Sequence, residues 1–165
     1  MIGFRPIRIR LIMEEDLALV RAWMNEAPGA PAWSDDDLTA VVQAPSADQH
    51  RLRTGWVAEQ TGSGMAGFAV ATGLSIPGTP AECELEFVLV HPQVRRVGIG
   101  AMLVHAALNW ARNLRADEIR LEVRESNTGA VQLYERCGFG RAGRRPAYFA
   151  DPREDALLMR RKLGC

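Results

Sequence analysis

The sequence has few cysteines and no excess of charge of either sign. Its three cysteines, Cys83, Cys137 and Cys165, are odd in number and widely spaced. This argues against a disulfide framework and a zinc knuckle, so we expect a reducing, cytoplasmic setting and no bound metal. The formal net charge is zero, whereas proteins that bind nucleic-acid backbones usually carry a marked positive excess. We therefore expect no direct contact with nucleic acid.

Long apolar runs are also missing. The first twenty residues are interrupted by Arg5, Arg8 and Arg10 and lack the apolar centre of a signal peptide. No apolar run is long enough to span a bilayer, so we expect no membrane association. A length of 165 residues suits one hydrophobic core, and we predict a single domain over residues 1–165.

Alternating and helically spaced apolar residues predict a chain that mixes strands and helices. Ile7, Ile9 and Leu11 alternate with arginines, which predicts a half-buried strand, and the same alternation recurs in residues 117–125. The predicted strands cover residues 5–12, 50–60, 65–74, 82–90, 117–125 and two segments around a proline turn within 147–163. The predicted helices cover residues 14–26, a segment after Ser34, a segment from Gly98 onward, and residues 127–138 with Asn127 as cap and Gly138 as stop.

The order of these elements predicts the architecture. We expect the early and late strands to pair antiparallel and the middle of the chain to form a strand–helix–strand unit, which gives an α/β fold, or α+β in stricter usage. Three aspartates, Asp35 to Asp37, follow Ser34. The preference of a helix N-terminus for negative charge explains them, and we do not assign them to a metal site.

Two glycines, Gly98 and Gly100, lie one residue apart at the start of a predicted helix. A P-loop would need a lysine and a serine or threonine after the second glycine, but Ala101 and Met102 stand there. A dinucleotide-binding turn would need a third glycine where the bulky Leu103 stands. From these residues alone, a plain strand-to-helix turn and a phosphate site remain equally open.

The arginines beside this turn favour an anion. Arg95, Gly98 and Gly100 spell the pattern R-x-x-G-x-G, and Arg96 adds a second positive charge. A turn without side chains presents several backbone N–H groups at a helix N-terminus, where negative charge is favoured. This arrangement suits a pyrophosphate and requires neither a metal nor a lysine.

Two separated segments resemble the GNAT superfamily of acyl-CoA-dependent N-acetyltransferases. EFVLVHPQVRRVGIGAMLVHAAL, residues 86–108, resembles its acetyl-CoA signature. LEVRESNTGAVQLYERCGF, residues 121–139, resembles its RimI-type branch, which acetylates the N-terminal alanine of a small-subunit ribosomal protein. The segments around Trp33 and Glu154 resemble that branch too, and the resemblance extends over residues 5–163. It implies a GNAT-like fold with a largely antiparallel central sheet, flanking helices and a strand–helix–strand unit that binds acetyl-CoA.

The resemblance also implies roles for individual residues. Glu122 matches the general base of the branch and Tyr134 its general acid. Trp33, Tyr148 and Phe149 would border the acceptor. The residues that would bind acetyl-CoA are Val88, Leu89 and Val90 along the pantetheine arm, Arg95, Arg96, Val97, Gly98, Ile99, Gly100 and Ala101 around the pyrophosphate, and Asn127 on the cofactor arm.

The chemistry of amide formation fits these residue types. An amine must be uncharged to attack a thioester, and a peptide α-amino group, with a pKa near ~8, is partly neutral in the cell. A carboxylate such as Glu122 can take the excess proton, and a phenol such as Tyr134 can protonate the leaving thiolate. Backbone N–H groups of residues 87–90 would stabilise the oxyanion if that strand separates from its neighbour. Without the resemblance, Glu122 is better explained as a surface residue and Tyr134 as part of an apolar helix face.

The acceptor side departs from the RimI-type pattern. Phe87 stands where that branch often has a small polar residue, and Ala32 replaces a frequent proline. Tyr148 and Phe149 stand where the branch often has two tyrosines. We therefore keep three hypotheses: an acetyltransferase of protein N-termini, a GNAT enzyme that acetylates a small amine, and a CoA-binding module without catalysis.

Overall fold

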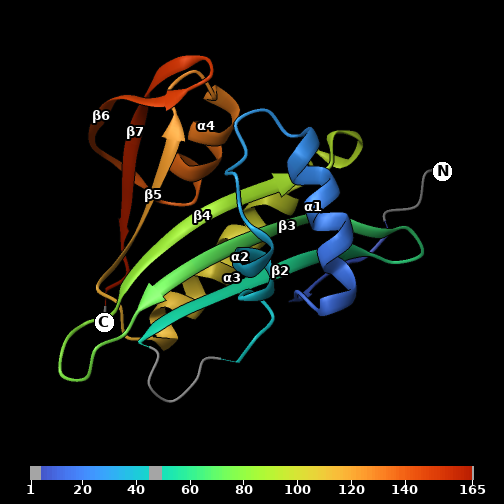
Figure 1. Ribbon diagram of the computed structural model, residues 1–165, viewed down its shortest axis with the longest axis horizontal. Coiled ribbons are helices and arrows are strands. Elements are labelled where there is room, and N and C mark those ends of the chain that lie inside the picture. Colours follow the sequence, from blue (N-terminus) through green and yellow to red (C-terminus); the bar gives the residue numbers. More distant parts are fainter. Residues whose placement is uncertain (1–4, 45–49, 165) are drawn as a thin grey trace.

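The computed structural model describes residues 5–44 and 50–164, so Cys165 and both ends of the predicted domain lie outside the described residues. A seven-stranded sheet with the order β1-β2-β3-β4-β5-β7-β6 forms its centre (Figure 1). All neighbouring strands run antiparallel except β4 and β5, which confirms the predicted fold class. The strands are β1 (Ile7–Leu11), β2 (Arg51–Gln60), β3 (Gly64–Leu74), β4 (Glu82–Val90), β5 (Glu118–Arg124), β6 (Gly140–Ala150) and β7 (Arg153–Lys162).

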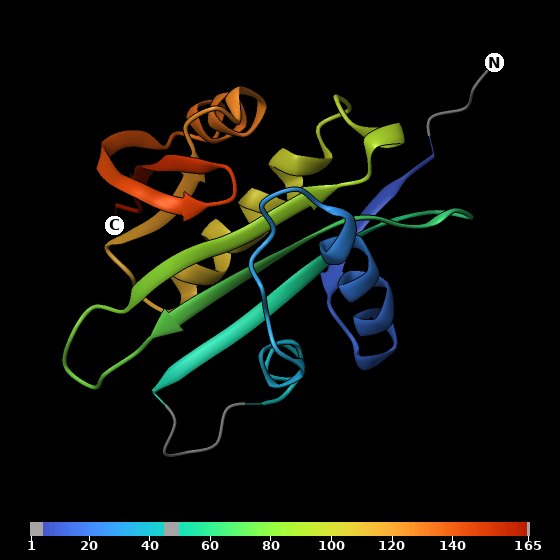
Figure 2. The ribbon, with the colours of Figure 1, turned by 45° about the horizontal axis from the view of Figure 1, so that its top comes forward.

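Two pairs of helices cover opposite faces of the sheet, as two views of the ribbon show (Figure 1; Figure 2). One face carries α1 (Leu17–Glu26) and α2 (Asp35–Thr39), and the other carries α3 (Ile99–Asn113) and α4 (Thr128–Arg136). The short 3-10 turns η1 (Glu14–Asp16) and η2 (Pro92–Val94) precede α1 and α3. Among the described residues, no helix has the length and apolar character needed to cross a membrane.

Each face of the sheet has its own apolar core. Alternation along β2 and β3 divides the side chains between the two cores, as expected for strands covered on both faces. Trp56 and Ala69 belong to the core under α3 and α4, whereas Val57 and Phe68 belong to the core under α1 and α2. The strands therefore lie between two helix layers. The candidate site lies where two neighbouring strands, β4 and β5, diverge.

β5 keeps the alternation that the sequence predicts. Ile119, Leu121 and Val123 are only 0%, 2% and 7% exposed and face the α3–α4 core. Glu122 and Arg124 therefore project to the α1–α2 face, because successive side chains on a strand point to opposite sides. This placement decides on which side of the sheet each candidate catalytic group lies.

Two predicted boundaries were wrong. The helix expected from residue 14 begins as the 3-10 turn η1, because the Asp16 carboxylate accepts hydrogen bonds from the Met13 N–H and the Arg10 guanidinium and so caps this turn. The strand expected from residue 147 begins at Gly140. All residues from 140 to 148 are exposed, so this half of β6 has no apolar alternation to reveal it.

Candidate active site

β4 contains a bulge halfway along its length. Its register with β3 shifts between the pairs Ala71–Leu85 and Val70–Phe87, so Glu86 is the extra residue. The extra residue interrupts the alternation of side chains. Leu85 packs into the α3–α4 core, whereas Phe87 packs against the α1–α2 core. The bulge therefore turns the second half of β4 relative to the first.

β4 and β5 pair only near their first residues. Their parallel register comprises Cys83 with Ile119 and Glu84 with Arg120, and beyond these pairs the two strands diverge (Figure 1). In the described part of the chain, the β4 segment 87–90 consequently has no strand partner on its β5 side. Among the described residues, this divergence leaves backbone groups of residues 87–90 without strand partners on that side, as stabilisation of an oxyanion would require.

The segment after β4 forms a turn with a left-handed backbone. Arg96 has φ 66° and Gly98, the N-cap of α3, has φ 89°. A Cβ at Gly98 would meet no atom within 4 Å, so the backbone angle and not crowding requires glycine there. The turn thus brings its N–H groups to the helix N-terminus beside an open space, as an anion site requires.

The other predicted cofactor residues contribute mainly backbone groups. Ile99 is 1% exposed and its side chain belongs to the core, while Val97 is 59% exposed. The Nε of Arg95 donates to the carbonyl of Val90 at 2.9 Å, so this arginine closes the turn after β4. On β4, Val88 and Val90 pack toward the α3–α4 core and Leu89 toward the α1–α2 core, and Ala101 packs against the α3–α4 core from the first turn of α3.

The two segments that carry the family resemblance meet at the start of α3. A Cβ at Gly100 would lie 2.9 Å from Cδ2 of Leu133 on α4, so the two helices touch there. Asn127 begins α4, since its Oδ1 accepts a hydrogen bond from the Ala130 N–H at 3.2 Å. An asparagine amide also has two N–H donors, so the capping role leaves room for a ligand contact.

Tyr134 lies inside the core on the α3–α4 side of β5. It is 8% exposed, and its ring centroid lies 5.8 Å from that of Phe139. Burial raises the pKa of its hydroxyl well above the usual value, because the anionic form loses its hydration. The phenol therefore stays protonated at physiological pH and retains the proton that a general acid needs.

Glu122 projects to the opposite face of the same strand. Its Oε1 lies 3.0 Å from Nη2 of Arg145, and its side chain is 19% exposed. It also accepts a hydrogen bond from the Tyr148 hydroxyl, which raises the pKa of Tyr148. The pKa of Glu84, on the adjacent β4, is raised by burial and by the nearby carboxylates of Glu122 and Glu86. Glu122 is thus part of a group of interacting charges and not an isolated surface glutamate.

Tyr148 and Phe149 lie side by side at the end of β6. Their ring centroids are 5.1 Å apart in an edge-on arrangement. The Arg145 guanidinium lies 4.9 Å from the Tyr148 centroid, and the Arg124 guanidinium lies 4.3 Å from the Phe149 centroid. Both predicted acceptor residues are therefore stacked on arginines, one of which binds Glu122 and the other of which belongs to β5.

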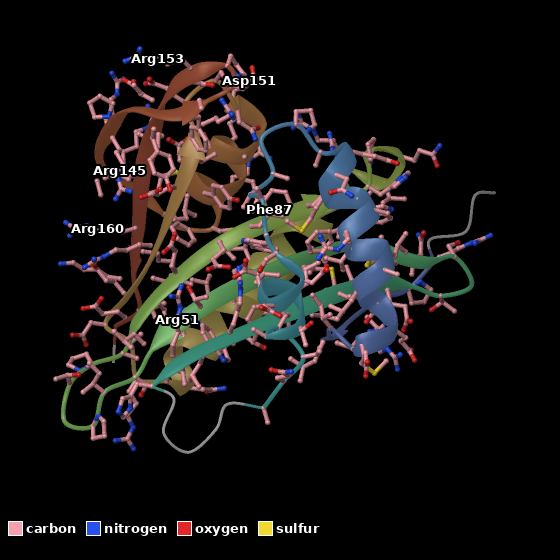
Figure 3. All side chains as sticks on the ribbon, in the orientation of Figure 1. Arg51, Phe87, Arg145, Asp151, Arg153 and Arg160 are labelled. Atoms are coloured by element: carbon pink, nitrogen blue, oxygen red, sulfur yellow. The ribbon has the colours of Figure 1, made fainter. Side chains whose placement is uncertain are left out.

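Trp33 lies on the opposite border, between α1 and α2. Its ring centroid is 4.5 Å from the Arg53 guanidinium and 6.1 Å from the ring of Phe87, which Figure 3 labels on β4. Arg53 also binds Asp37 at 3.0 Å and the bulge residue Glu86 at 2.5 Å. The structure thus links Trp33 to the bulge of β4 through one guanidinium.

The predicted groups gather on the two sides of the gap between β4 and β5. The glycine turn and Tyr134 lie on the α3–α4 side, and Glu122, Trp33 and Tyr148 lie on the α1–α2 side. The predicted cofactor residues and the predicted acceptor residues therefore lie on opposite faces of the sheet, beside the strands that diverge. In residues 5–44 and 50–164, no three His, Cys, Asp or Glu side chains are grouped so that they could hold a metal ion.

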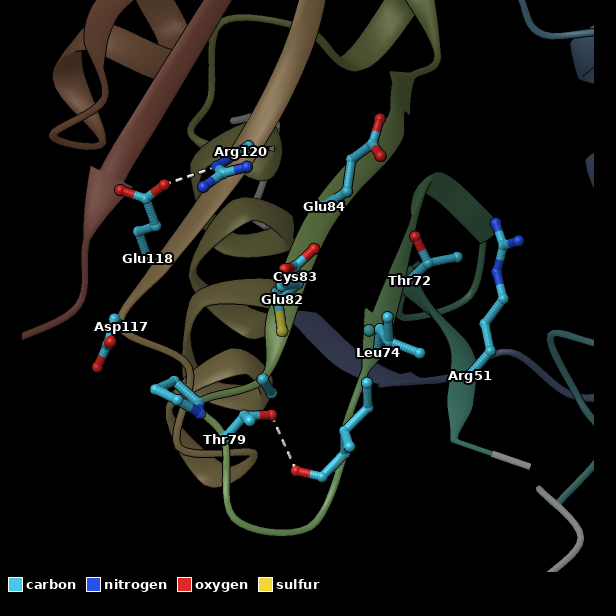
Figure 4. Close-up of a pocket in the computed structure, with 14 residues that line it drawn as sticks. Arg51, Thr72, Leu74, Thr79, Glu82, Cys83, Glu84, Asp117, Glu118 and Arg120 are labelled. Carbon is cyan, nitrogen blue, oxygen red and sulfur yellow. Dashed lines mark hydrogen bonds and ion pairs between the residues drawn. The ribbon is translucent and has the colours of Figure 1, made fainter. Parts of the chain in front are cut away.

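A cavity of about 780 Å³ lies elsewhere, at the paired ends of β4 and β5 (Figure 4). Polar side chains such as Arg51, Thr72 and Glu84 line it, and beside them the Nε of Arg120 donates to Glu118 at 2.6 Å. None of the predicted cofactor or acceptor residues lines this cavity. The candidate site therefore rests on the geometry of the gap and not on the volume of a cavity.

Three arginines at the candidate site were not predicted from the sequence. Arg53, Arg124 and Arg145 each lie over the ring of a predicted acceptor residue. Alternation places Arg124 on the same face as Glu122, and this signal was available in the sequence. Arg145 lies in the exposed half of β6, where no apolar pattern indicates a strand, so nothing in the sequence pointed to it.

Known proteins resemble this chain in sequence. Residues 17–139 match the family model described as "Acetyltransferase (GNAT) family". The chain is 35% identical over 111 residues to the N-alpha-acetyltransferase RimI of Mycobacterium tuberculosis, which covers 66% of each protein. It is 35% identical over 126 residues to the mycothiol acetyltransferase of Salinispora arenicola, which covers 76% of this chain and 40% of that protein. The chain thus spans less than two thirds of the length of both relatives.

A solved structure agrees over nearly the whole chain. The crystal structure of the ribosomal-protein-S18-alanine N-acetyltransferase from Escherichia coli has a TM-score of 0.74 and 27% identity to this chain, and the match covers 97% of this chain and 96% of that one. The family match includes the glycine turn, α4, and the strands β4 and β5, which border the gap. The chain therefore belongs to the GNAT acetyltransferase family.

Proposed function

We propose that this protein transfers the acetyl group of acetyl-CoA to a primary amine, namely the N-terminal α-amino group of a protein. In a RimI-like reaction this group belongs to an N-terminal alanine of a ribosomal protein, in the cytoplasm. The observation that carries the proposal is the gap between β4 and β5, with a buried phenol on one face and a carboxylate on the other. The M. tuberculosis relative is named an N-alpha-acetyltransferase and the E. coli structure a ribosomal-protein-S18-alanine N-acetyltransferase, which supports this acceptor class.

The glycine turn suits the diphosphate of acetyl-CoA. The left-handed backbone at Arg96 and Gly98 and the open space beside Gly98 support a cradle of N–H groups from residues 96–101. The side of β4 that faces the gap, residues 87–90, offers backbone groups to the amides of the pantetheine arm. When it is bound, acetyl-CoA supplies an activated thioester carbonyl.

In this proposal Glu122 and Tyr134 move the two protons of the reaction. Glu122 takes a proton from the attacking amine on the α1–α2 side, directly or through a water. As the new carbon–nitrogen bond forms and the carbon–sulfur bond breaks, Tyr134 gives its proton to the leaving thiolate. Its raised pKa keeps that proton in place until then. N–H groups of residues 87–90 stabilise the negative charge on the carbonyl oxygen.

The borders of the acceptor side favour an extended peptide. Trp33 lies on one border, and Tyr148 and Phe149 lie on the other, so an N-terminus has aromatic surface on both sides. Tyr148 is 47% exposed, which leaves its ring available to a ligand. Aromatic side chains offer rigid contact surface at a small cost in conformational entropy, and they suit the recognition of varied peptide side chains.

Transfer of radiolabelled acetyl groups tests the proposal. Peptides with a free N-terminal alanine or serine are compared with the same peptides carrying a blocked N-terminus and an internal lysine. We expect acetylation of the free N-termini and a fall in kcat of about 10²-fold in Glu122→Gln. Glu118→Gln, on the same face of β5, is the matched control and should keep its activity. Binding of acetyl-CoA without transfer to any amine would contradict the proposal and favour the hypothesis of a CoA-binding module without catalysis.

A small amine is the second candidate acceptor. The mycothiol acetyltransferase relative favours it, since that match covers more of this chain than the RimI match does. The same radiolabelled transfer assay should therefore also include polyamines, amino acids and aminoglycosides as acceptors. A kcat/KM that is higher for one of these amines than for every peptide would select this candidate.

A further inference from the structure

Two segments border the acceptor side of the gap, and one guanidinium touches both. The first segment, residues 27–34, joins α1 to α2, and the second, residues 149–152, contains the turn between β6 and β7. We propose that Arg124 is a positioning residue that fixes the distance between these two segments and thereby the width of the acceptor slot. The inference rests on the proposed function, because it requires an acceptor that enters between the segments.

Arg124 holds the β6–β7 turn by several contacts. Its Nη2 donates to the carbonyl of Asp151 at 2.9 Å, and its Nη1 donates to the carbonyl of Pro152 at 3.0 Å. The same Nη1 lies 3.4 Å from the carboxylate of Glu154, and the guanidinium lies 4.3 Å from the ring centroid of Phe149. A guanidinium has five N–H donors in a fixed plane, so it can bind two adjacent carbonyls and still stack on a ring.

Arg124 also meets the segment between α1 and α2. Gly29 has φ +73°, and a Cβ built on it would lie 2.7 Å from Nε and 3.4 Å from Cδ of Arg124. The backbone of this segment can lie so close to the arginine only because Gly29 has no side chain. The Arg124 side chain is 17% exposed, so it is largely enclosed by its neighbours.

The position of Arg124 on β5 couples this contact to the site. It follows Glu122 by two residues and projects to the same face of the sheet. Glu154 balances its charge with one carboxylate oxygen, while the other accepts the Ser126 N–H at 2.5 Å. The arginine therefore has a fixed place between the candidate base and both borders of the slot. A lysine has a single point charge and cannot reproduce these contacts.

Steady-state kinetics with a peptide that has a free N-terminal alanine test the inference. In Arg124→Met and Arg124→Lys we expect the KM for the peptide to rise about tenfold, with kcat at saturating peptide within about twofold and the KM for acetyl-CoA unchanged. Arg120→Met is the matched control, because Arg120 lies on the same face but is 67% exposed and binds Glu118. Loss of folded protein alone would lower kcat and leave both KM values unchanged, and that result would overturn the inference.

Hydrogen exchange provides a readout that does not depend on transfer. We expect amides in residues 27–34 and 149–152 to exchange faster in Arg124→Met and at the wild-type rate in Arg120→Met. Wild-type exchange in both segments of Arg124→Met would overturn the inference even in an active enzyme. If the wild type acetylates no amine while both segments exchange faster in Arg124→Met, the proposed function fails and the tie between the segments stands.

A double-mutant cycle tests the contact itself. Gly29→Ala places a Cβ against the Arg124 side chain, so we expect it to raise the KM for the peptide several-fold in the wild-type background. In the Arg124→Met background the same change should have a clearly smaller effect, because the obstructing guanidinium is gone. Additive effects of the two substitutions would show that Gly29 and Arg124 act independently, against the inference.

Discussion

On the α3–α4 face of the sheet the candidate cofactor site is made mainly of backbone, whereas on the α1–α2 face the candidate acceptor site is made of side chains. Around Gly98 the predicted contacts are N–H groups, and the polar side chain that completes this face is the buried Tyr134. Across the gap, Arg53, Arg124 and Arg145 each hold an aromatic residue in place by stacking and ion pairs. The candidate site thus has two halves that are built differently: a cofactor half made mainly of backbone groups and an acceptor half made of side chains.

This difference explains why a sequence motif can identify the cofactor half of the site more readily than the acceptor half. A backbone cradle requires glycine at fixed positions, so its sequence pattern is narrow. A surface built from paired side chains can be rebuilt with other residue pairs and has no comparably narrow pattern. Phe87, Phe149 and Ala32 all depart from the RimI-type residues on this second side, while the R-x-x-G-x-G turn is intact. Acceptor choice can thus change while the cofactor half stays the same.

The largest effect is expected at Tyr134, the buried phenol of the cofactor half. Tyr134→Phe should lower kcat by about 10²-fold or more, because the leaving thiolate loses its proton donor. The Kd for acetyl-CoA and the melting temperature should change little, since the ring remains. Because the pKa of Tyr134 is raised, the wild-type rate should show no loss from ionisation of this tyrosine up to its ordinary pKa near ~10. Stopped-flow turnover at saturating acetyl-CoA measures this, and near-wild-type turnover would refute the acid role.

The backbone half can be disturbed through Gly98. A residue with a Cβ pays about 1–2 kcal/mol in the left-handed region, so Gly98→Ala should raise the Kd for acetyl-CoA by about tenfold. The KM for the acceptor should stay within about twofold. Gly78→Ala is the control, because Gly78 has φ +84° and equally free surroundings but lies in the β3–β4 loop. Calorimetry should find weaker binding of acetyl-CoA only in Gly98→Ala. An equal loss of affinity in Gly78→Ala would contradict a role of the glycine turn in binding acetyl-CoA.

The side-chain half can be disturbed through Arg53. Arg53→Met leaves the carboxylate of Glu86, whose side chain is 15% exposed, without its cation. Breaking such a largely buried pair should lower the free energy of unfolding by about 2 kcal/mol. It also removes the guanidinium that stacks on the Trp33 ring. Urea denaturation measures the loss. Arg8→Met, which breaks an exposed pair with Glu59, should cause no measurable loss, and equal effects of the two changes would contradict the difference in burial.

The smallest effect is expected at the thiols of the α3–α4 core. Burial raises the pKa of Cys83 to about 11 and also raises the pKa of Cys137. Both thiols should therefore stay protonated at pH 8, and iodoacetamide should not modify them in folded protein of the variant Cys165→Ser. Mass spectrometry checks this, with the urea-unfolded variant as the control. Rapid alkylation of the folded variant would show that this core opens.

The sequence predicted those features that local patterns determine. Alternation placed Glu122 on the correct face of β5, and the caps at Ser34 and Asn127 lie where the helices begin. The bulge at Glu86 and the divergence of β4 from β5 depend on pairing between distant segments, which no local pattern records. The first half of β6 was missed because its residues are exposed and have no apolar period.

The short pairing between β4 and β5 has a mechanical consequence. Because these strands share register only at Cys83–Ile119 and Glu84–Arg120, the seven strands amount to a four-stranded and a three-stranded sheet that share one seam. Tilting one part against the other about this seam would widen or narrow the cleft between them while every other ladder stays intact. Such a rotation would change access to the gap without unfolding any strand.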